Sequence, residues 1–381
     1  MHAKAPGRKG FFFAPWRLCA IYFIFDMMNV DILIIGQGIC GTMLSWHLQK
    51  AGLSFLIIDE QKPNTASKAA AGIINPVTGR RIVKTWMIDE LMPFVLNAYQ
   101  SIEKEFNIKL ISQKKIIDFF PSPQMRLAFT KRFEEDTTYL AIPGQENAWR
   151  EQFNYEFGFG EITPVYLVDV QLLLSLVRKK FVDQHWLLEE RFDIEHLSAE
   201  ENEIRYKGIS AKKIIFCDGI QCEKNPYFNG LPFAPNKGEV LIIESDNIPI
   251  THIYKKGINI VPWENNLFWV GSSYEWEFDN DQPTESFRNK TEALLTHWLQ
   301  SSFKIVDHFA SVRPATLERR PFIGFHPARQ AVGIMNGMGT KGCSLAPYFA
   351  EELVQSIVSG APISGEANVN RFSKILMRTI S

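Results

Sequence analysis

The feature that most constrains this chain is a glycine-rich turn between two apolar runs, within residues 30–60. The first run, Ile32–Ile35, is typical of a strand buried on both faces of a parallel sheet. Residues 39–51 then fit a helix that Gly52 ends, and residues 54–58 fit a second strand. The pattern therefore predicts a strand, a turn, a helix and a parallel strand in that order. The turn reads G-x-G-x-x-G, with its glycines at Gly36, Gly38 and Gly41, and an acid, Asp59, follows the second strand.

Each part of this unit has a physical role in binding a dinucleotide. The first glycine allows the tight turn, the second lets a pyrophosphate approach the backbone, and the third lets the helix pack closely on the strand. The helix N-terminus at Ile39 and Cys40 offers N–H groups to phosphate oxygens, and Asp59 can accept hydrogen bonds from a ribose. No Arg or Lys stands immediately beside Asp59, which argues against NADP. The motif alone does not separate NAD from FAD.

Composition excludes several classes of protein. At 381 residues and 46% hydrophobic content the chain can bury a large core, and two domains are expected. The net charge of −1 provides no field for nucleic acid or an anionic membrane, so we expect neither as a partner. The 5 cysteines are scattered and predict neither a disulfide framework nor a metal site. A reducing compartment fits this usage, and we expect a cytoplasmic protein.

The first 27 residues stand apart from this pattern. Basic residues precede an apolar run at 18–25, as in a signal peptide, but Pro15, Arg17 and Asp26 interrupt the apolar stretch. The run is also too short and too broken to span a bilayer. We interpret residues 1–27 as a disordered or mis-annotated extension, in preference to a targeting segment.

The rest of the chain alternates between helical and strand patterns. A loop of small residues at 65–76 would let backbone approach something flat and bulky. From Gly238 onward the pattern changes to antiparallel strands, while residues 121–165 are aromatic, loop-rich and hard to assign. We expect helices over 91–106, 169–183, 287–299 and 345–358, and strands over 114–120, 192–197, 203–206, 213–216, 239–243, 258–261, 267–271, 312–314 and 331–335.

Five segments together resemble one known family. They are the glycine-rich unit at 30–59, the small-residue loop Ser67–Pro76, the strand Lys213–Gly219, the segment 231–239, and the pair Val312–Thr316 and Asn336–Gly342 with their flanking residues. Over roughly residues 30–360 the chain resembles the D-amino acid oxidase and glycine oxidase family of FAD enzymes. The resemblance makes FAD the expected dinucleotide. It also implies non-covalent FAD, because Arg313 stands where sarcosine oxidase-like members carry the cysteine that bonds to the flavin.

The resemblance assigns further residues to the cofactor. The glycines of the 336–342 loop would let backbone lie against the isoalloxazine edge, and the helix from Cys343 would direct its positive end at the pyrimidine side of the ring. Besides the residues of the first unit, the expected cofactor-binding residues are Glu60, Ser67, Lys68, Ala71, Gly72, Ile73, Ile194, Cys217, Gly219, Gly337, Gly339, Thr340, Lys341 and Gly342.

Arg313 is the expected catalytic residue. It falls where glycine oxidase-like members place the guanidinium that binds the substrate carboxylate, and a planar guanidinium suits a carboxylate because it can donate two parallel hydrogen bonds. A structural ion pair with Glu318 is the competing interpretation. Asn259 stands where such members carry a tyrosine, so substrate identity does not carry over. The other candidate substrate residues are Asn259, Tyr254, Tyr274 and Met338.

The sequence therefore predicts an α/β flavoprotein with two interleaved domains. A Rossmann-like parallel-sheet FAD domain would use residues 28–105, 160–235 and 305–381, and an antiparallel-sheet substrate domain would use 106–159 and 236–304. The resemblance implies oxidation of a small amine or amino acid at its C–N bond, with hydride transfer to flavin N5 and O2 or an unknown acceptor taking the electrons. The alternatives are a 2-hydroxy acid dehydrogenase, a flavin-dependent tRNA-modification oxidoreductase, or a flavin-binding sensor or assembly protein without turnover.

Overall fold

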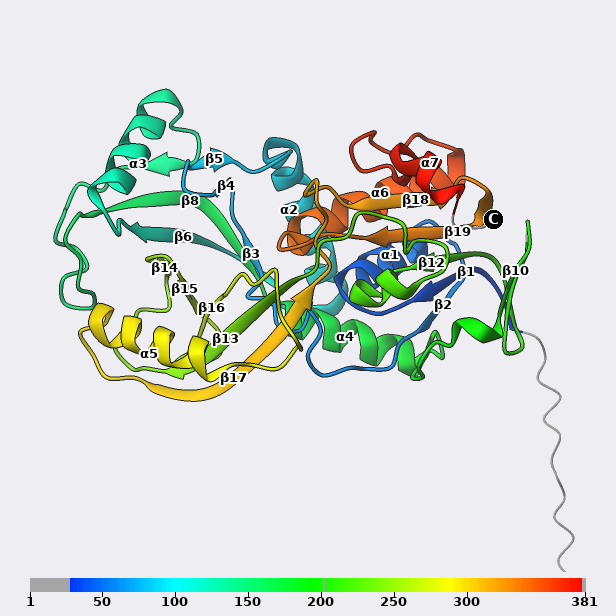
Figure 1. Ribbon diagram of the computed structural model, residues 1–381, viewed down its shortest axis with the longest axis horizontal. Helices are drawn as coiled ribbons and strands as arrows, with labels where there is room; N and C mark the ends of the chain where they lie inside the picture. The colour runs from blue at the N-terminus through cyan, green and yellow to red at the C-terminus, as the bar shows by residue number, and fades with distance from the viewer. Residues whose placement is uncertain (1–27, 202, 379–381) are drawn as a thin grey trace, which may run out of the picture.

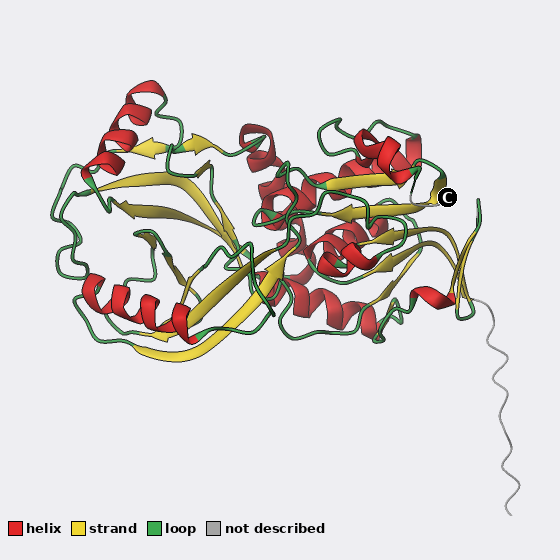
Figure 2. Cartoon of the chain, viewed as in Figure 1, coloured by secondary structure: helices red, strands yellow, loops and turns green. Residues whose placement is uncertain are grey.

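The computed structural model describes residues 28–201 and 203–378, so the predicted extension at 1–27 lies outside the described residues. The fold is α/β, as predicted, and its two sheets lie side by side along the long axis of the molecule (Figure 1). Most helices gather around the sheet that contains the glycine-rich unit, while the other sheet carries one helix near its strands and another at its far end (Figure 2).

The first sheet has 8 strands and a parallel centre. β1 pairs in parallel with β2 on one side and with β12 on the other, and β12 pairs in parallel with β19. Because the carboxyl ends of β1, β2 and β12 meet at one edge, this sheet brings Gly36, Asp59 and Cys217 to the same place. Its strands are β1 (Met28–Ile35), β2 (Phe55–Ile58), β9 (Leu187–Leu188), β10 (Leu197–Ala199), β11 (Ile204–Tyr206), β12 (Ile209–Phe216), β18 (Phe322–His326) and β19 (Arg329–Asn336).

Both faces of this sheet are buried, which explains its nearly continuous apolar strands. Alternate residues of β1 divide between two cores: Ile32 and Ile34 pack in the core that contains the long helices, and Leu33 and Ile35 pack on the opposite face. The long helices are α1 (Ile39–Lys50), α2 (Ile88–Phe106), α4 (Val170–Asp183) and α6 (Gly342–Ser359). Shorter helices follow at η1 (Ile194–His196), η2 (Gly219–Lys224), η3 (Val369–Phe372) and α7 (Ser373–Leu376).

The second sheet has 9 strands and is mainly antiparallel, with one parallel pair between β6 and β14. The long strands β13 and β17 run from its far end to the junction with the first sheet (Figure 1). Its strands are β3 (Ile73–Ile74), β6 (Ile111–Phe119), β7 (Leu140–Ala141), β8 (Phe159–Val168), β13 (Asn236–Glu244), β14 (Ile253–Lys255), β15 (Asn259–Pro262), β16 (Leu267–Gly271) and β17 (Lys304–Arg313). Beside it lie α3 (Pro123–Glu135), α5 (Glu285–Trp298) and the small hairpin of β4 (Val77–Thr78) and β5 (Val83–Lys84).

Three local expectations differ from the structure. The loop-rich stretch contains helix α3, whose first turn is capped by the Ser122 side chain and whose one buried residue, Phe129, leaves no apolar periodicity to detect. Half of the expected strand at 192–197 is the short helix η1, because the Asp193 side chain accepts a hydrogen bond from the Glu195 N–H and turns the chain. Residues 160–168 and 305–313, which we expected in the FAD domain, belong to the second sheet.

Candidate active site

A cavity of about 480 Å³ is lined by residues of both sheets and of the loops between them. From the first sheet and its loops it takes the glycine-rich turn, the small-residue loop and the N-terminus of α6, and from the second sheet it takes parts of β13, β15, β16 and β17. The predicted residues that line it are Gly36, Gly38, Ile39, Cys40, Asp59, Glu60, Ser67, Ala71, Gly72, Ile73, Cys217, Gly219, Asn259, Tyr274, Arg313, Met338, Gly339, Thr340 and Gly342.

Two of the three glycines in the glycine-rich turn leave no room for a side chain. Gly36 has a φ of +97°, and a Cβ there would lie 2.6 Å from the carbonyl oxygen of Cys217. A Cβ on Gly41 would lie 2.0 Å from the carbonyl oxygen of Gly36, so this glycine sets the contact between helix and turn without lining the cavity. The space above Gly38 is limited by Ser67, whose Oγ would be 3.0 Å from a Cβ. The turn therefore presents bare backbone to the cavity.

Two helices begin at this cavity, and both leave N–H groups free there. The Ser67 hydroxyl accepts the Ile39 N–H at 3.0 Å, and the N–H of Thr42 donates to the Gly38 carbonyl oxygen at 2.9 Å. Between them, within residues 28–201 and 203–378, nothing accepts the N–H groups of Cys40 and Gly41. The same is true of Gly342 and Cys343 at the start of α6. Free N–H groups at helix N-termini are suited to phosphate oxygens and to partial negative charge on a ligand.

The carboxylate of Asp59 is held in a fixed orientation at the cavity edge. Its Oδ2 accepts the N–H of Gln37 at 2.8 Å, and its Oδ1 accepts from Arg178 Nη1 at 2.8 Å. Arg178 comes from α4, far away in the sequence, so the expectation that no cation stands beside Asp59 holds only for its sequence neighbours. The same guanidinium also donates to Gln37 Oε1 at 2.9 Å and to Glu189 at 2.9 Å, so three side chains hold it in place.

The small-residue loop passes between the two sheets. A Cβ on Gly72 would lie 1.9 Å from the carbonyl oxygen of Val168, so only glycine allows this approach to β8. From the second sheet, the Trp269 indole N–H donates to the carbonyl oxygen of Ala69 at 3.0 Å. Because the Ser67 hydroxyl of the same loop accepts the Ile39 N–H of α1, the loop is tied to both halves of the cavity wall.

Arg313 ends β17 and faces the cavity, and its hydrogen-bond partners among the described residues are neutral. Its Nη1 donates to Asn236 Oδ1 at 2.6 Å, and its Nη2 donates to Ser272 Oγ at 2.7 Å. No carboxylate in the described part of the chain pairs with it, and Glu318, the competing partner, pairs with Arg371 at 3.1 Å. Burial lowers the pKa of Arg313 from its ordinary value. The ion-pair interpretation with Glu318 is therefore wrong.

The residues around Arg313 leave room for its guanidinium. A Cβ on Gly238 would lie 1.6 Å from Nη2, so glycine is required beside it on β13. The Tyr274 ring stacks against the guanidinium at 4.9 Å and is itself 61% exposed, at the outer side of the cavity. Asn259 lines the cavity from β15 and donates to the carbonyl oxygen of Gly271 at 3.3 Å, and Met338 lines it from the loop before α6.

Besides Gly41, five predicted residues do not line the cavity. Tyr254 is fully buried in the core of the second sheet, where its hydroxyl donates to the carbonyl oxygen of Pro249 at 2.9 Å. The prediction that it contacts substrate is therefore wrong. Ile194 packs in the core on the opposite face of the first sheet and does not line the cavity. Lys68 directs its amine to the carbonyl oxygen of Lys62. Gly337 lies against Thr316, and Lys341 donates to Thr85 Oγ1 at 3.2 Å.

Other lining residues were not predicted. Asp218 follows β12, and Asn336 Nδ2 lies 3.3 Å from its Oδ1. Burial raises the pKa of Asp218 to about 7. Ser272, Asp281 and Trp269 also line the cavity. Trp269 lies in a correctly predicted strand. Because nearly every residue of that strand is apolar, the sequence did not show which of its side chains face the cavity.

Comparison with known proteins identifies the family. The profile of the DAO family, FAD-dependent oxidoreductases, matches residues 31–356. The chain belongs to this family. It is 26% identical over 360 residues to a glycine oxidase of Bacillus licheniformis, covering 88% of this chain and 95% of that protein. It is 21% identical over 367 residues to a glycine oxidase of Pseudomonas aeruginosa, covering 88% of this chain and 97% of that protein.

Solved structures show the same fold. The glycine oxidase of Bacillus cereus aligns with a TM-score of 0.74 at 16% identity, over 87% of this chain and 96% of the other. Iminodiacetate oxidase of Chelativorans aligns with a TM-score of 0.69 at 19% identity, over 88% and 96%. The protein is thus an FAD-dependent oxidoreductase. The bare glycine turn and the free N–H groups at the starts of α1 and α6 fit this cofactor. In the described residues no helix is long and apolar enough to cross a membrane.

Proposed function

We propose that this protein oxidises a small amino acid, or another amine that carries a carboxylate, at its C–N bond. The observation that carries the proposal is Arg313: a half-buried guanidinium that lines the cofactor cavity and has only neutral hydrogen-bond partners among the described residues. A cation without a counter-ion in such a cavity is suited to an anionic group of a ligand, and a carboxylate matches its planar donors. The glycine oxidase and iminodiacetate oxidase among its relatives and structural neighbours, by their names, act on substrates of this class.

The cofactor would occupy the part of the cavity next to the first sheet. The free N–H group of Cys40 would bind the pyrophosphate, and the fixed Asp59 carboxylate would accept hydrogen bonds from the ribose hydroxyls. The N-terminus of α6 at Gly342 and Cys343 would stabilise negative charge on the flavin. Burial raises the pKa of the Cys343 thiol to about 12, so this thiol stays neutral beside the ring. We propose that FAD is held without a covalent bond.

The substrate would lie between the cofactor and the second sheet. Arg313 would hold its carboxylate, and Tyr274 would cover the guanidinium on the side of the solvent. Asn259 and Met338 would form the neighbouring wall. When bound, FAD supplies the redox chemistry by accepting a hydride from the α-carbon at flavin N5. The protein's contribution is then to fix the carboxylate and so direct the α-carbon towards the cofactor.

Product analysis tests this proposal. The FAD-loaded protein is incubated with glycine, sarcosine, iminodiacetate, D- and L-alanine and L-proline, and separately with 2-hydroxy acids, using O2 or an artificial dye as acceptor. We expect at least one amine to give the 2-oxo acid or imine-derived product with ammonia or a primary amine. Oxidation of hydroxy acids alone would support the dehydrogenase alternative. Absence of turnover with every class would support a flavin-binding protein without catalysis.

A further inference from the structure

Helix α6 contains a proline close to the end that faces the cavity. In an α-helix the N–H of Pro347 would donate to the carbonyl oxygen of Cys343, four residues earlier. Proline has no N–H, so this carbonyl loses its helical partner. Cys343 is only 8% exposed, and an unsatisfied carbonyl in such a place is unfavourable. The first turn of α6 therefore needs a donor from elsewhere.

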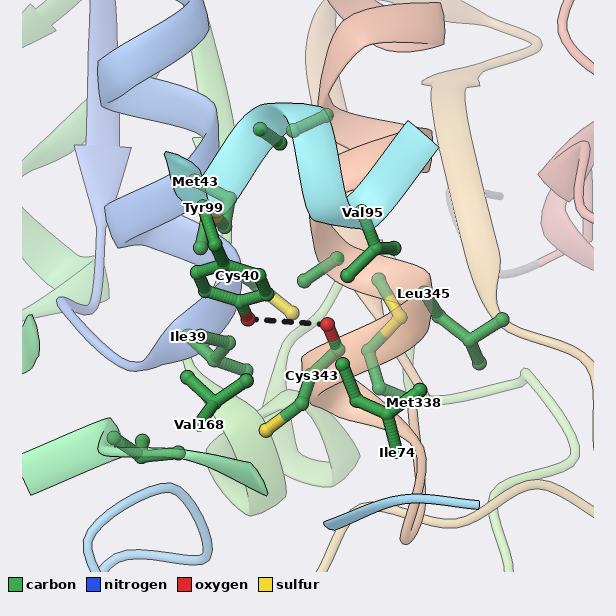
Figure 3. Packing of buried hydrophobic residues seen from close by; sticks show 14 of the residues in the cluster. Ile39, Cys40, Met43, Ile74, Val95, Tyr99, Val168, Met338, Cys343 and Leu345 are labelled. Atoms are coloured by element: carbon green, nitrogen blue, oxygen red, sulfur yellow. Dashed lines mark hydrogen bonds between the residues drawn. The ribbon is translucent and has the colours of Figure 1, made fainter. Parts of the chain in front are cut away.

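Tyr99 provides that donor. It lies on α2, is 0% exposed, and its hydroxyl donates to the Cys343 carbonyl oxygen at 3.0 Å (Figure 3). Burial raises the pKa of Tyr99 well above its ordinary value, so the hydroxyl keeps its proton. Figure 3 also places Met43, Cys40 and Ile39 of α1 around the same point. A side chain of α2 thus replaces a backbone donor of α6.

The position of this bond ties it to the cofactor. The carbonyl that Tyr99 holds belongs to Cys343, which lines the cavity and carries one of the free N–H groups at the start of α6. We propose that Tyr99 is a positioning residue: by replacing the donor that Pro347 lacks, it orients the first turn of α6 so that the helix N-terminus stabilises negative charge on the flavin. This inference rests on FAD binding at this cavity and not on the identity of the substrate.

A double-variant cycle tests the inference. Tyr99→Phe removes only the hydroxyl, and Pro347→Ala supplies the missing N–H. The readouts are the dissociation constant of FAD, the two-electron reduction potential of the bound flavin, and the affinity of the flavin for sulfite, which adds to the ring and leaves negative charge at the pyrimidine side. None of these readouts requires turnover of a substrate.

We expect Tyr99→Phe to weaken binding of FAD or sulfite about three- to tenfold, the loss typical of one hydrogen bond, and to make the potential more negative because the reduced flavin loses stabilisation. Pro347→Ala alone should change little, since one carbonyl oxygen can accept two donors. The double variant Tyr99→Phe/Pro347→Ala should recover most of the affinity and potential, because the helix again supplies its own donor.

Tyr254→Phe is the matched control. Tyr254 is also 0% exposed and its hydroxyl also donates to a backbone carbonyl oxygen, that of Pro249, in the core of the second sheet. It should lower the melting temperature to a similar extent without moving the flavin readouts. The inference is overturned if Tyr99→Phe lowers only the melting temperature, or if Pro347→Ala fails to restore the flavin properties of the double variant. If the substrate assignment fails while this cycle behaves as expected, the inference stands.

Discussion

The two ends of the cavity are built in different ways. At the end next to the first sheet much of the wall is backbone: the glycine-rich turn, and the first N–H groups of α1 and α6. At the end next to the second sheet the walls are side chains from several strands, and Arg313 is held by neutral partners from β13 and from the segment after β16. Backbone geometry fixes the first end strongly, whereas a few substitutions can change the second.

This difference is consistent with what the relatives show. The family profile matches most of the chain, yet the names of the structural neighbours range from glycine oxidase to L-proline dehydrogenase and L-alpha-glycerophosphate oxidase. A cofactor site made of backbone can stay constant while the side chains opposite it vary. We therefore expect variants at the two ends to have different effects. Substitutions at the end next to the first sheet should weaken FAD binding, and substitutions at the end next to the second sheet should change the kinetics with substrate.

The largest expected effect on FAD binding is at the glycine-rich turn. Gly41→Ala would place a Cβ 2.0 Å from a backbone carbonyl oxygen, so the turn must shift and FAD binding should weaken on the order of 100-fold or be lost. Titration of the apoprotein with FAD, followed by flavin fluorescence, measures this. Gly144→Ala is the control, since nothing lies within 4 Å of a Cβ there. Unchanged FAD affinity in Gly41→Ala would show that the backbone geometry of this turn does not determine FAD binding.

Asp218 offers a test of the end of the cavity next to the first sheet. It lines the cavity there, and its raised pKa of about 7 makes it titrate near neutral pH. An acid whose folded pKa is raised from 3.8 destabilises the fold once ionised, so its cost is absent below about pH 4 and complete above about pH 7. Asp218→Asn should therefore be more stable than the wild type at pH 8. Its free energy of unfolding should be higher by up to about 4 kcal/mol, at ~1.4 kcal/mol per pKa unit.

The measurement is denaturant unfolding of the apoprotein between pH 4 and pH 8. The two proteins should be equally stable at the acid end and diverge as the pH rises. Parallel stability curves would mean that this carboxyl is ionised throughout, and that the first end tolerates a buried negative charge.

Arg313 tests the second end. Arg313→Lys keeps the charge but loses the planar pair of donors. It should lower kcat/KM roughly 10- to 150-fold, which corresponds to a loss of about 1.5–3 kcal/mol of transition-state stabilisation. The dissociation constant of FAD should stay unchanged. Competitive inhibition by simple carboxylates such as acetate should weaken in parallel. Loss of FAD or of the fold, with inhibitor binding intact, would assign Arg313 to structure.

Tyr274 carries the smallest expected effect. Its exposed ring stacks on the Arg313 guanidinium at 4.9 Å, and an interaction of this kind is worth about 0.5–1 kcal/mol at an exposed site. Tyr274→Ala should raise KM about two- to fivefold with little change in kcat, and Tyr274→Phe should behave like the wild type. A loss of kcat in both variants would instead give the hydroxyl a direct part in the reaction.

The first end of the site could be predicted from the sequence because its parts are contiguous. Gly36 to Asp59 form one local unit with a fixed order of strand, turn, helix and strand, whereas the 336–342 loop was assigned to the cofactor through the family resemblance. The unit's own sequence did not reveal Arg178, because that cation reaches Asp59 from a helix more than 100 residues away.

The second end was predicted less completely for the same reason. Tyr254 and Asn259 lie on adjacent strands, yet one faces the buried core and the other the cavity, and a one-residue change in register decides which. Ser272 and Asp281 lie in an irregular segment after β16 that has no periodicity. Arg313 was found through a family resemblance, since its partners are remote in the sequence.

The most direct test of the account combines both ends in one measurement. The FAD-loaded wild type and Arg313→Lys are mixed anaerobically with the best amine substrate and with the analogue that lacks the carboxylate, such as glycine and methylamine, while the visible absorption of the flavin is followed. We predict rapid bleaching for the wild type with the carboxylated amine, bleaching roughly 10- to 150-fold slower for Arg313→Lys with that amine, and slow bleaching with the other amine at a rate that the substitution leaves unchanged. Bleaching that does not depend on the carboxylate, or that falls by the same factor for both amines in the variant, would contradict the account.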